Sequence, residues 1–193
     1  MESERVCTNA MECSNVYKFD YKEVMIMRYK SIKILSVILL SNISSITFAQ
    51  ANNENIIYKK LVLKATKEKV WSALTNKNEL GKWWNSGVRL EPYEGGQFYE
   101  PWGDGQLATG KVIELKMYNF IKFTWQEKCW NSSEKTLCKL KLRTNGGTTI
   151  LEVNHSGWKT FKEIDNRKKL IEGFKKGWGA LLPKLKKYVE SDY

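Results

Sequence analysis

The C-terminal part of the chain carries one apolar stripe that constrains the whole fold. Its members are spaced by three and four residues: Ile171, Phe174, Trp178, Leu181, Leu182, Leu185 and Val189. This spacing predicts a long helix with one face against a core. Pro183 inside it removes a backbone hydrogen bond, while Gly179 four residues earlier relieves the clash with the proline ring. We therefore expect a continuous, slightly bent helix.

The residues before this stripe alternate between apolar and polar with a period of two. Glycine- and asparagine-rich turns separate the predicted strands, which cover residues 88–90, 97–101, 107–117, 120–128, 136–143 and 148–155. Short strands at this spacing predict an antiparallel meander. Upstream, residues 56–65 form another predicted strand. Thr66 is an N-cap candidate for a helix over 67–74, and Asn76 with Glu79 resembles the capping box of a second short helix ending at Trp83-Trp84.

The first fifty-one residues are typical of export rather than of a folded domain. A basic segment at 27–33 precedes an apolar run at 34–46, and Ala49 with Ala51 gives a small-x-small cleavage pattern. This arrangement predicts a signal peptide over 27–51, cleaved near Gln50 or Ala51, and a periplasmic or secreted protein. An uncleaved membrane anchor is the alternative. Residues 1–26 are expected to be a disordered or non-native extension, and residues 52–193 the folded domain.

The charge balance is basic, with a net charge of +11 and a pI of about 9.4. From Asn52 onward there are 26 Lys and Arg against 16 Asp and Glu, without a block of five like charges. This distribution favours a solvated lysine-rich surface over a nucleic-acid partner, and no nucleic acid is expected. Binding to anionic polymers or membranes is the alternative. With one histidine and no Cys-x-x-Cys pair, we expect neither a metal site nor another cofactor.

Several short motifs appear in the same order as the predicted elements. They are residues 70–75 (VWSALT), Trp83-Trp84, 95–98 (GGQF), 110–114 (GKVIE), 123–125 (FTW), 149–158 (TILEVNHSGW) and Gly177-Trp178. Together they resemble the SRPBCC superfamily, most closely the branch related to activators of the heat-shock chaperone ATPase. The resemblance implies an α+β helix-grip (START-like) fold. A curved antiparallel sheet of about six to seven strands would surround the long C-terminal helix, with two short helices after the first strand.

Members of this superfamily typically hold hydrophobic ligands between the sheet and the helix, some catalyse cyclisation or hydrolysis, and others assist chaperone ATPases. For this chain the resemblance implies a protein that binds an apolar or amphipathic small molecule. The predicted signal peptide adds that it is exported, without stable membrane insertion once the signal is cleaved. Plain core packing is the alternative role for its aromatic residues. The candidate ligand-binding residues are Trp83, Trp84, Phe98, Trp125, His155, Trp158, Phe174 and Trp178.

A cyclase- or hydrolase-like enzyme in the same cavity is an alternative function, although we expect a binding protein and name no catalytic residue. The enzyme would need His155, or a carboxylate with a shifted pKa, facing inward. Glu100, Asp104 and Glu114 are the candidate acidic partners. A structural role is the other interpretation of His155. A function like that of the chaperone-ATPase activators is a further alternative, but an exported protein would not meet a cytosolic chaperone.

Cys129 and Cys138 flank a predicted turn at residues 131–133. If they stand opposite each other in a hairpin, the same register pairs Trp125 with Leu142 and Phe123 with Thr144. An exported protein can keep such a disulfide, so we predict a Cys129–Cys138 bridge. Two free, buried thiols are the alternative.

Overall fold

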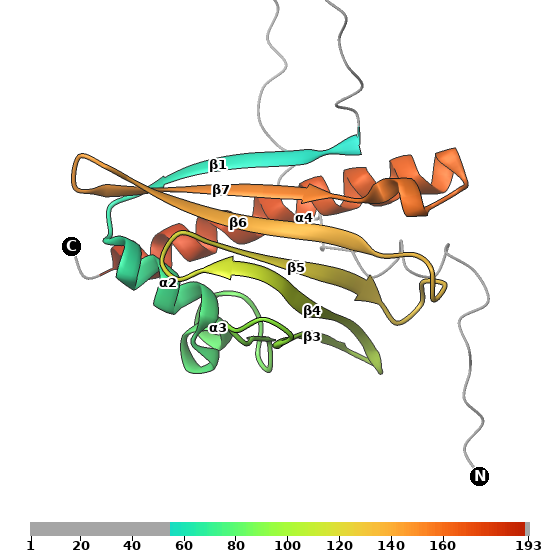
Figure 1. Cartoon of the computed structure of the whole chain (residues 1–193), viewed down its shortest axis with the longest axis horizontal. Helices are drawn as coiled ribbons and strands as arrows, with labels where there is room; N and C mark the ends of the chain where they lie inside the picture. The colour runs from blue at the N-terminus through green and yellow to red at the C-terminus, as the bar shows by residue number, and fades with distance from the viewer. Residues whose placement is uncertain (1–54, 192–193) are drawn as a thin grey trace, which may run out of the picture. The chain divides into compact units, whose positions relative to one another are not determined.

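The computed structural model describes residues 55–191 and shows a seven-stranded antiparallel sheet with a long helix packed on one face (Figure 1). The strand order across the sheet is β1-β7-β6-β5-β4-β3-β2, so the strands from β2 to β7 follow one another as a meander and β1 joins beside β7. The predicted α+β helix-grip fold is confirmed. The expected extension at 1–26 and signal peptide at 27–51 lie outside the described residues.

Two short helices follow the first strand, as predicted: β1 spans Ile57–Leu63, α2 Lys67–Thr75 and α3 Lys77–Trp83. Thr66 caps α2, because its side-chain oxygen accepts a hydrogen bond from the Lys69 backbone N–H at 3.2 Å. Asn76 ends α2 and also caps α3. The predicted reciprocal bond from Glu79 does not form, since its carboxylate instead accepts a hydrogen bond from Ser72 Oγ at 2.6 Å, which ties α3 to α2.

The meander has the period-two burial that its sequence predicts, with one row of side chains facing the helix. The remaining elements are β2 Arg89–Leu90, β3 Gln97–Gly103, β4 Gln106–Lys116, β5 Phe120–Glu127, β6 Thr136–Asn145, β7 Thr148–Ser156, the 3₁₀ helix η2 Trp158–Thr160 and α4 Ile164–Glu190. The continuous α4 contains Pro183, as expected, and buries its apolar stripe against the sheet.

Gly110 lies where β4 passes very close to the backbone of β5. A Cβ at this position would lie 1.7 Å from the carbonyl oxygen of Thr124 on β5. The register between β4 and β5 also shifts between Val112 and Glu114, which is a bulge. A glycine is therefore required where β4 bends, because any side chain would collide with the neighbouring backbone.

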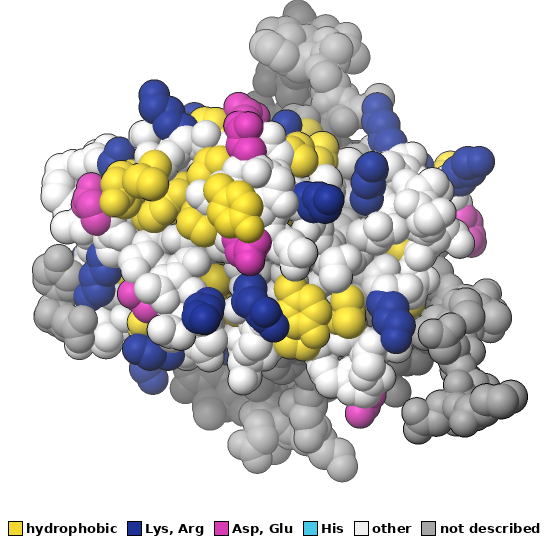
Figure 2. Space-filling view, turned by 60° about the horizontal axis from the view of Figure 1, so that its bottom comes forward, with side chains coloured by type: hydrophobic (Ala, Val, Ile, Leu, Met, Phe, Trp, Pro, Cys, Tyr) yellow, Lys and Arg dark blue, Asp and Glu magenta, His cyan; other side chains and the backbone are white. Residues whose placement is uncertain are grey.

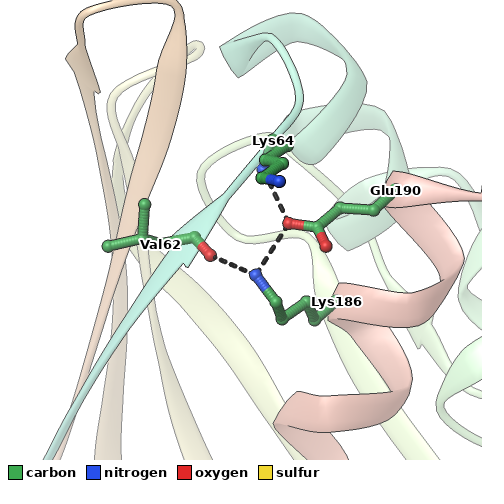
Figure 3. A network of polar contacts seen from close by, with 4 residues as sticks. All are labelled: Val62, Lys64, Lys186 and Glu190. Atoms are coloured by element: carbon green, nitrogen blue, oxygen red, sulfur yellow. Dashed lines mark hydrogen bonds and ion pairs between the residues drawn. The ribbon is translucent and has the colours of Figure 1, made fainter. Parts of the chain in front are cut away.

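The C-terminal end of α4 is tied to the edge strand β1 (Figure 3). Lys186 Nζ donates a hydrogen bond to the Val62 carbonyl at 2.8 Å and pairs with Glu190, whose carboxylate accepts one from the Lys64 N–H at 2.7 Å. These contacts occupy backbone groups at the open edge of β1, where another strand could otherwise pair.

The predicted Cys129–Cys138 disulfide is wrong. In the β5–β6 hairpin, Phe123 stands opposite Cys138 and Trp125 opposite Thr136, whereas the prediction required Thr144 and Leu142. Cys129 follows the end of β5, and Cys138 is a free, fully buried thiol. The two cysteines therefore do not face each other.

The surface of the described domain is mixed in character. Figure 2 shows a face on which Lys and Arg side chains stand apart from one another, with hydrophobic side chains gathered in two groups between them. Within residues 55–191, no helix has the length and apolar character needed to span a membrane. The same residues contain no group of three or more His, Cys, Asp or Glu side chains arranged to hold a metal ion.

Candidate ligand site between the sheet and the long helix

All eight predicted ligand-binding residues lie in the interior between the sheet and α4. They come from six elements of the fold: Trp83 and Trp84 from the end of α3, Phe98 from β3, Trp125 from β5, His155 from β7, Trp158 from η2, and Phe174 and Trp178 from α4. Each is at most 7% exposed. The alternation of the strands and the stripe of the helix thus direct distant parts of the sequence toward one place.

Ring contacts connect these side chains into one cluster. Trp125 is central, with ring centroids 4.6 Å from Phe98, 5.5 Å from Phe174 and 6.3 Å from Trp178. Trp84 contacts Trp125 at 6.2 Å and Trp178 at 5.7 Å. Offset and edge-to-face pairs of this kind stabilise an interior beyond simple area burial. The cluster is therefore a packed aromatic layer that joins the sheet to the helix.

His155 lies at one end of this layer, with both ring nitrogens bonded to the protein. The indole N–H of Trp178 donates to Nδ1 at 3.2 Å, so the ring proton is on Nε2 and donates to Thr136 Oγ1 at 2.7 Å. The Thr136 hydroxyl in turn donates to the Trp125 carbonyl at 3.3 Å. Both ring nitrogens of His155 and the Thr136 hydroxyl thus have partners, which is the usual state of a buried structural network.

The electrostatic surroundings of His155 do not favour a role as a general base. Burial lowers the pKa of His155 to about 3, because the imidazolium would lose its hydration, and no carboxylate opposes this effect. Of the three proposed acidic partners, Asp104 lies in the exposed β3–β4 turn and Glu114 is exposed on β4. The histidine therefore stays neutral, with its lone pair already engaged by Trp178.

Glu100 is the one of those three carboxylates that faces inward. It lies on β3, two residues after Phe98 and on the same face, and is 7% exposed. Its Oε1 accepts a hydrogen bond from the Trp84 indole at 2.6 Å. Its buried Oε2 has no hydrogen-bond partner within the described part of the chain. A buried carboxyl group is thus only half satisfied.

The environment of Glu100 favours its protonated form. Burial raises the pKa of Glu100 to about 7, while the indole N–H groups of Trp84 and Trp102 act in the opposite direction. No charged side chain contributes to this shift. The carboxyl group can therefore exist in either protonation state near neutral pH, unlike an ordinary surface glutamate.

Two indole N–H groups share this unsatisfied state. Trp125 Nε1 and Trp130 Nε1 are buried and have no acceptor among residues 55–191, whereas the indoles of Trp83 and Trp158 donate to backbone carbonyls. Trp130 joins the aromatic layer through Phe174, at a centroid distance of 6.0 Å. The interior therefore contains both an unpaired acceptor and unpaired donors.

The family assignment rests on a match that covers most of the described domain. Residues 64–190 match the family described as Activator of Hsp90 ATPase homolog 1-like protein. The chain belongs to this family. The predicted branch of the SRPBCC superfamily is thereby confirmed. No curated protein matches the chain.

Solved structures agree with this fold at low sequence identity. Protein MLL2253 from Mesorhizobium loti has a TM-score of 0.60 at 18% identity, over 72% of this chain and 98% of that one. The Aha1 dimer from Colwellia psychrerythraea gives 0.57 at 22%, over 70% and 96%. DynU16, a putative protein in the dynemicin biosynthetic locus, gives 0.58 at 18% over 72% of this chain, which spans only 48% of DynU16. These likenesses show the fold alone.

Sequence reasoning within the family pattern missed Thr136, Trp102 and Trp130, and it gave Glu100 only as one of three possible partners of His155. A signal for Glu100 was present, because Phe98 and Glu100 alternate with outward residues along one strand. The same alternation places Thr136 on the inner face with Cys138. Trp130 follows the last residue of β5, where no periodicity applies.

Proposed function

We propose that the chain binds an apolar or amphipathic small molecule in the aromatic interior between the sheet and α4. The observation that carries this proposal is the coexistence of Glu100 Oε2 and Trp125 Nε1 as buried polar atoms without partners among the described residues. Both side chains contact Trp84, so they belong to one region of the interior. A ligand with a polar group would satisfy them.

Folding buries these two polar atoms without giving them hydrogen bonds. A buried polar atom without a hydrogen bond costs about 1–3 kcal/mol. Sites that bind small molecules combine apolar and aromatic walls with a few polar groups that fix orientation. The Trp84 and Trp125 rings supply such walls, and Glu100 with the Trp125 N–H supplies the polar groups. Binding would therefore recover free energy that the protein alone does not.

An enzyme in the same interior is the second candidate, and Glu100 is the observation that favours it. A carboxyl group with a pKa of about 7 is suited to accept or donate a proton near neutral pH. His155 is the less suitable residue, because both of its nitrogens are occupied and its pKa is low. A catalytic version of this proposal thus places the proton transfer on Glu100.

The setting of this activity is part of the proposal. We propose that the protein is exported after cleavage near Gln50 or Ala51, which would separate it from a cytosolic chaperone. Activation of a chaperone ATPase, the role in the family's name, is then the less favoured function. On the face seen in Figure 2, the Lys and Arg side chains stand apart from one another, so this face does not form the single lysine-rich patch that binding to an anionic surface would need.

Native mass spectrometry of the full-length chain, purified from its own host, tests the binding function. A bound molecule that is lost on denaturation would support the proposal and give the ligand's mass. The Trp125→Phe variant keeps an aromatic ring at this position but loses the indole N–H, so retention of the adduct should fall. Trp71→Phe is the matched control, because it makes the same substitution at a buried tryptophan of α2 outside the eight candidate positions. A clean mass, unchanged after soaking in lipids and aromatic metabolites, would contradict the proposal.

A further inference from the structure

We infer that the ligand of this interior carries a protonated amine, which pairs with the carboxylate of Glu100. The inference rests on the proposed binding function and narrows it to one chemical class, an apolar molecule with an ammonium group. Three observations lead to it: the hydrogen-bonding state of Glu100, the rings around it and the absence of a countercharge.

The hydrogen-bonding state calls for a donor. Oε1 of Glu100 is already engaged by the Trp84 indole at 2.6 Å, while Oε2 is buried without a partner in the described chain. In its ionised form, which is the form that would pair with a cation, the carboxylate only accepts hydrogen bonds, so the partner of Oε2 in that form brings an N–H or O–H. An ammonium group has several N–H donors and would fill this position.

The surrounding rings favour a cation. Trp84, which donates to the carboxylate, lies 5.3 Å from Trp83, 6.2 Å from Phe98 and 6.2 Å from Trp125 between ring centroids. Aromatic faces attract ammonium groups through their quadrupole, and tryptophan does so most strongly. A neutral hydroxyl would gain the hydrogen bond without this second attraction.

The carboxylate lacks a countercharge from the protein. Glu100 is in none of the ion pairs found among residues 55–191, which include Arg143–Glu152, Lys175–Glu172 and Lys186–Glu190. The groups that affect its pKa are the indoles of Trp84 and Trp102, and no charged side chain is among them. A buried carboxylate is strongly unfavourable until a cation joins it. The ligand's ammonium group would be that cation.

Trp102 indicates how the amine end could reach Glu100. It lies on β3 two residues after Glu100, within the register irregularity between Pro101 and Gly103, and it is half-buried. Its indole is close enough to Glu100 to lower the pKa of the carboxyl group. A half-buried side chain at a strand irregularity thus lies beside Glu100, and we place the route of the amine along Trp102.

A matched pair of ligands tests the amine requirement directly. Titration calorimetry at about pH 8 would compare 2-naphthylmethylamine with 2-naphthylmethanol, and octylamine with octanol, on the full-length chain. We expect each amine to bind at least about tenfold more tightly than its alcohol. Equal affinities would overturn the amine inference and leave the binding function standing. Binding of none of these compounds, together with a clean native mass, would overturn both.

Two further measurements identify Glu100 as the recognition group. Glu100→Gln should remove the preference for the amine, while Glu114→Gln, an exposed carboxylate on β4, should keep it. In wild type near pH 6, amine binding should release a proton from Glu100, seen as a heat that depends on the buffer's ionisation enthalpy. Alcohol binding should release none. A preference for the amine that persists in a folded Glu100→Gln variant, or amine binding without proton release, would overturn the assignment.

Discussion

His155 and Glu100 are two buried titratable residues that face the same aromatic layer and differ in how fully the fold satisfies them. His155 is 0% exposed, and both of its ring nitrogens have partners, Trp178 and Thr136. Glu100 is 7% exposed, and only one of its two oxygens has a partner. Burial alone therefore does not distinguish these two residues, whereas hydrogen-bond satisfaction does.

The difference follows from the elements that surround each residue. His155 stands on β7, between the long strands β1 and β6, opposite Ile57 on one side and Cys138 on the other. Glu100 stands on β3, close to the sheet edge, where the two-residue strand β2 is its only neighbour on one side. β2 pairs only with Phe98 and Tyr99 of β3, so no residue of β2 stands beside Glu100. Glu100 therefore lacks a strand neighbour of the kind that His155 has on both sides, and this is the end of the interior where we propose that a ligand supplies the missing partner.

The largest expected effect on stability is that of replacing His155, whose hydrogen bonds are all made within the fold. His155→Ala should lower the free energy of unfolding by about 3–5 kcal/mol, because it opens a cavity and leaves the Trp178 N–H unpaired. Denaturant unfolding followed by tryptophan fluorescence would measure it. The control is Asn154→Ala, the preceding residue, which points to the outer face of the same strand. A loss below about 1 kcal/mol would show that the network is not structural.

The next effect is the pH dependence of stability, to which Glu100 and His155 contribute with opposite signs. The folded-state pKa of Glu100 is raised, so the folded protein binds more protons and stability falls as pH rises from about 4.5 to about 7. The folded-state pKa of His155 is lowered to about 3, so its contribution makes stability rise with pH between about 3 and 6.5. In wild type the two contributions oppose each other between about pH 4.5 and 6.5.

The Glu100→Gln variant isolates the contribution of Glu100 to the pH dependence of stability. The stability difference between this variant and wild type should grow in the variant's favour from about pH 4.5 to about 7, by up to about 3 kcal/mol, and then level off. Thermal or urea unfolding across this pH range measures it, with Glu114→Gln as the exposed control. A difference that does not change with pH would show that Glu100 titrates normally.

A smaller effect tests the hydroxyl that links the His155 network to the sheet. Thr136→Val keeps the shape of the side chain and removes the acceptor of the His155 Nε2–H. We expect a loss of about 1–3 kcal/mol, because one buried donor becomes unpaired. Urea unfolding measures it, and Thr136→Ser, which keeps the hydroxyl, is the control. Equal losses in both variants would mean that the hydrogen bond contributes nothing.

The fold was predictable because its periodicities are strong and consistent along the chain. The helical stripe from Ile171 to Val189 and the alternation from Gln97 to His155 each specify one buried face. Their order then matched a known family pattern. The eight predicted aromatic and histidine positions lie together for the same reason, since each occupies an inward position of its element.

The strand register was not predictable, and the reason is physical. The predicted pairing of Trp125 with Leu142 and the observed pairing with Thr136 differ by an even number of residues. An even shift puts the same side chains on the same face, so alternation cannot distinguish the two registers. The hydrogen bonding of Glu100 was not predictable either, because it depends on which atoms of other elements reach its carboxyl group.

Replacing Cys138 has the smallest expected effect, and it tests what stabilises the region around His155. It lies opposite His155 on the adjacent strand and is fully buried, but it makes none of the hydrogen bonds of the network. Cys138→Ala should therefore cost only about 1 kcal/mol through lost packing, equally in reducing and oxidising conditions. Urea unfolding with and without reductant measures it, with Cys138→Ser as the polar comparison. A loss of several kcal/mol that disappeared in reductant would reveal a disulfide at Cys138. The region around His155 would then depend on a covalent link rather than on packing and hydrogen bonds.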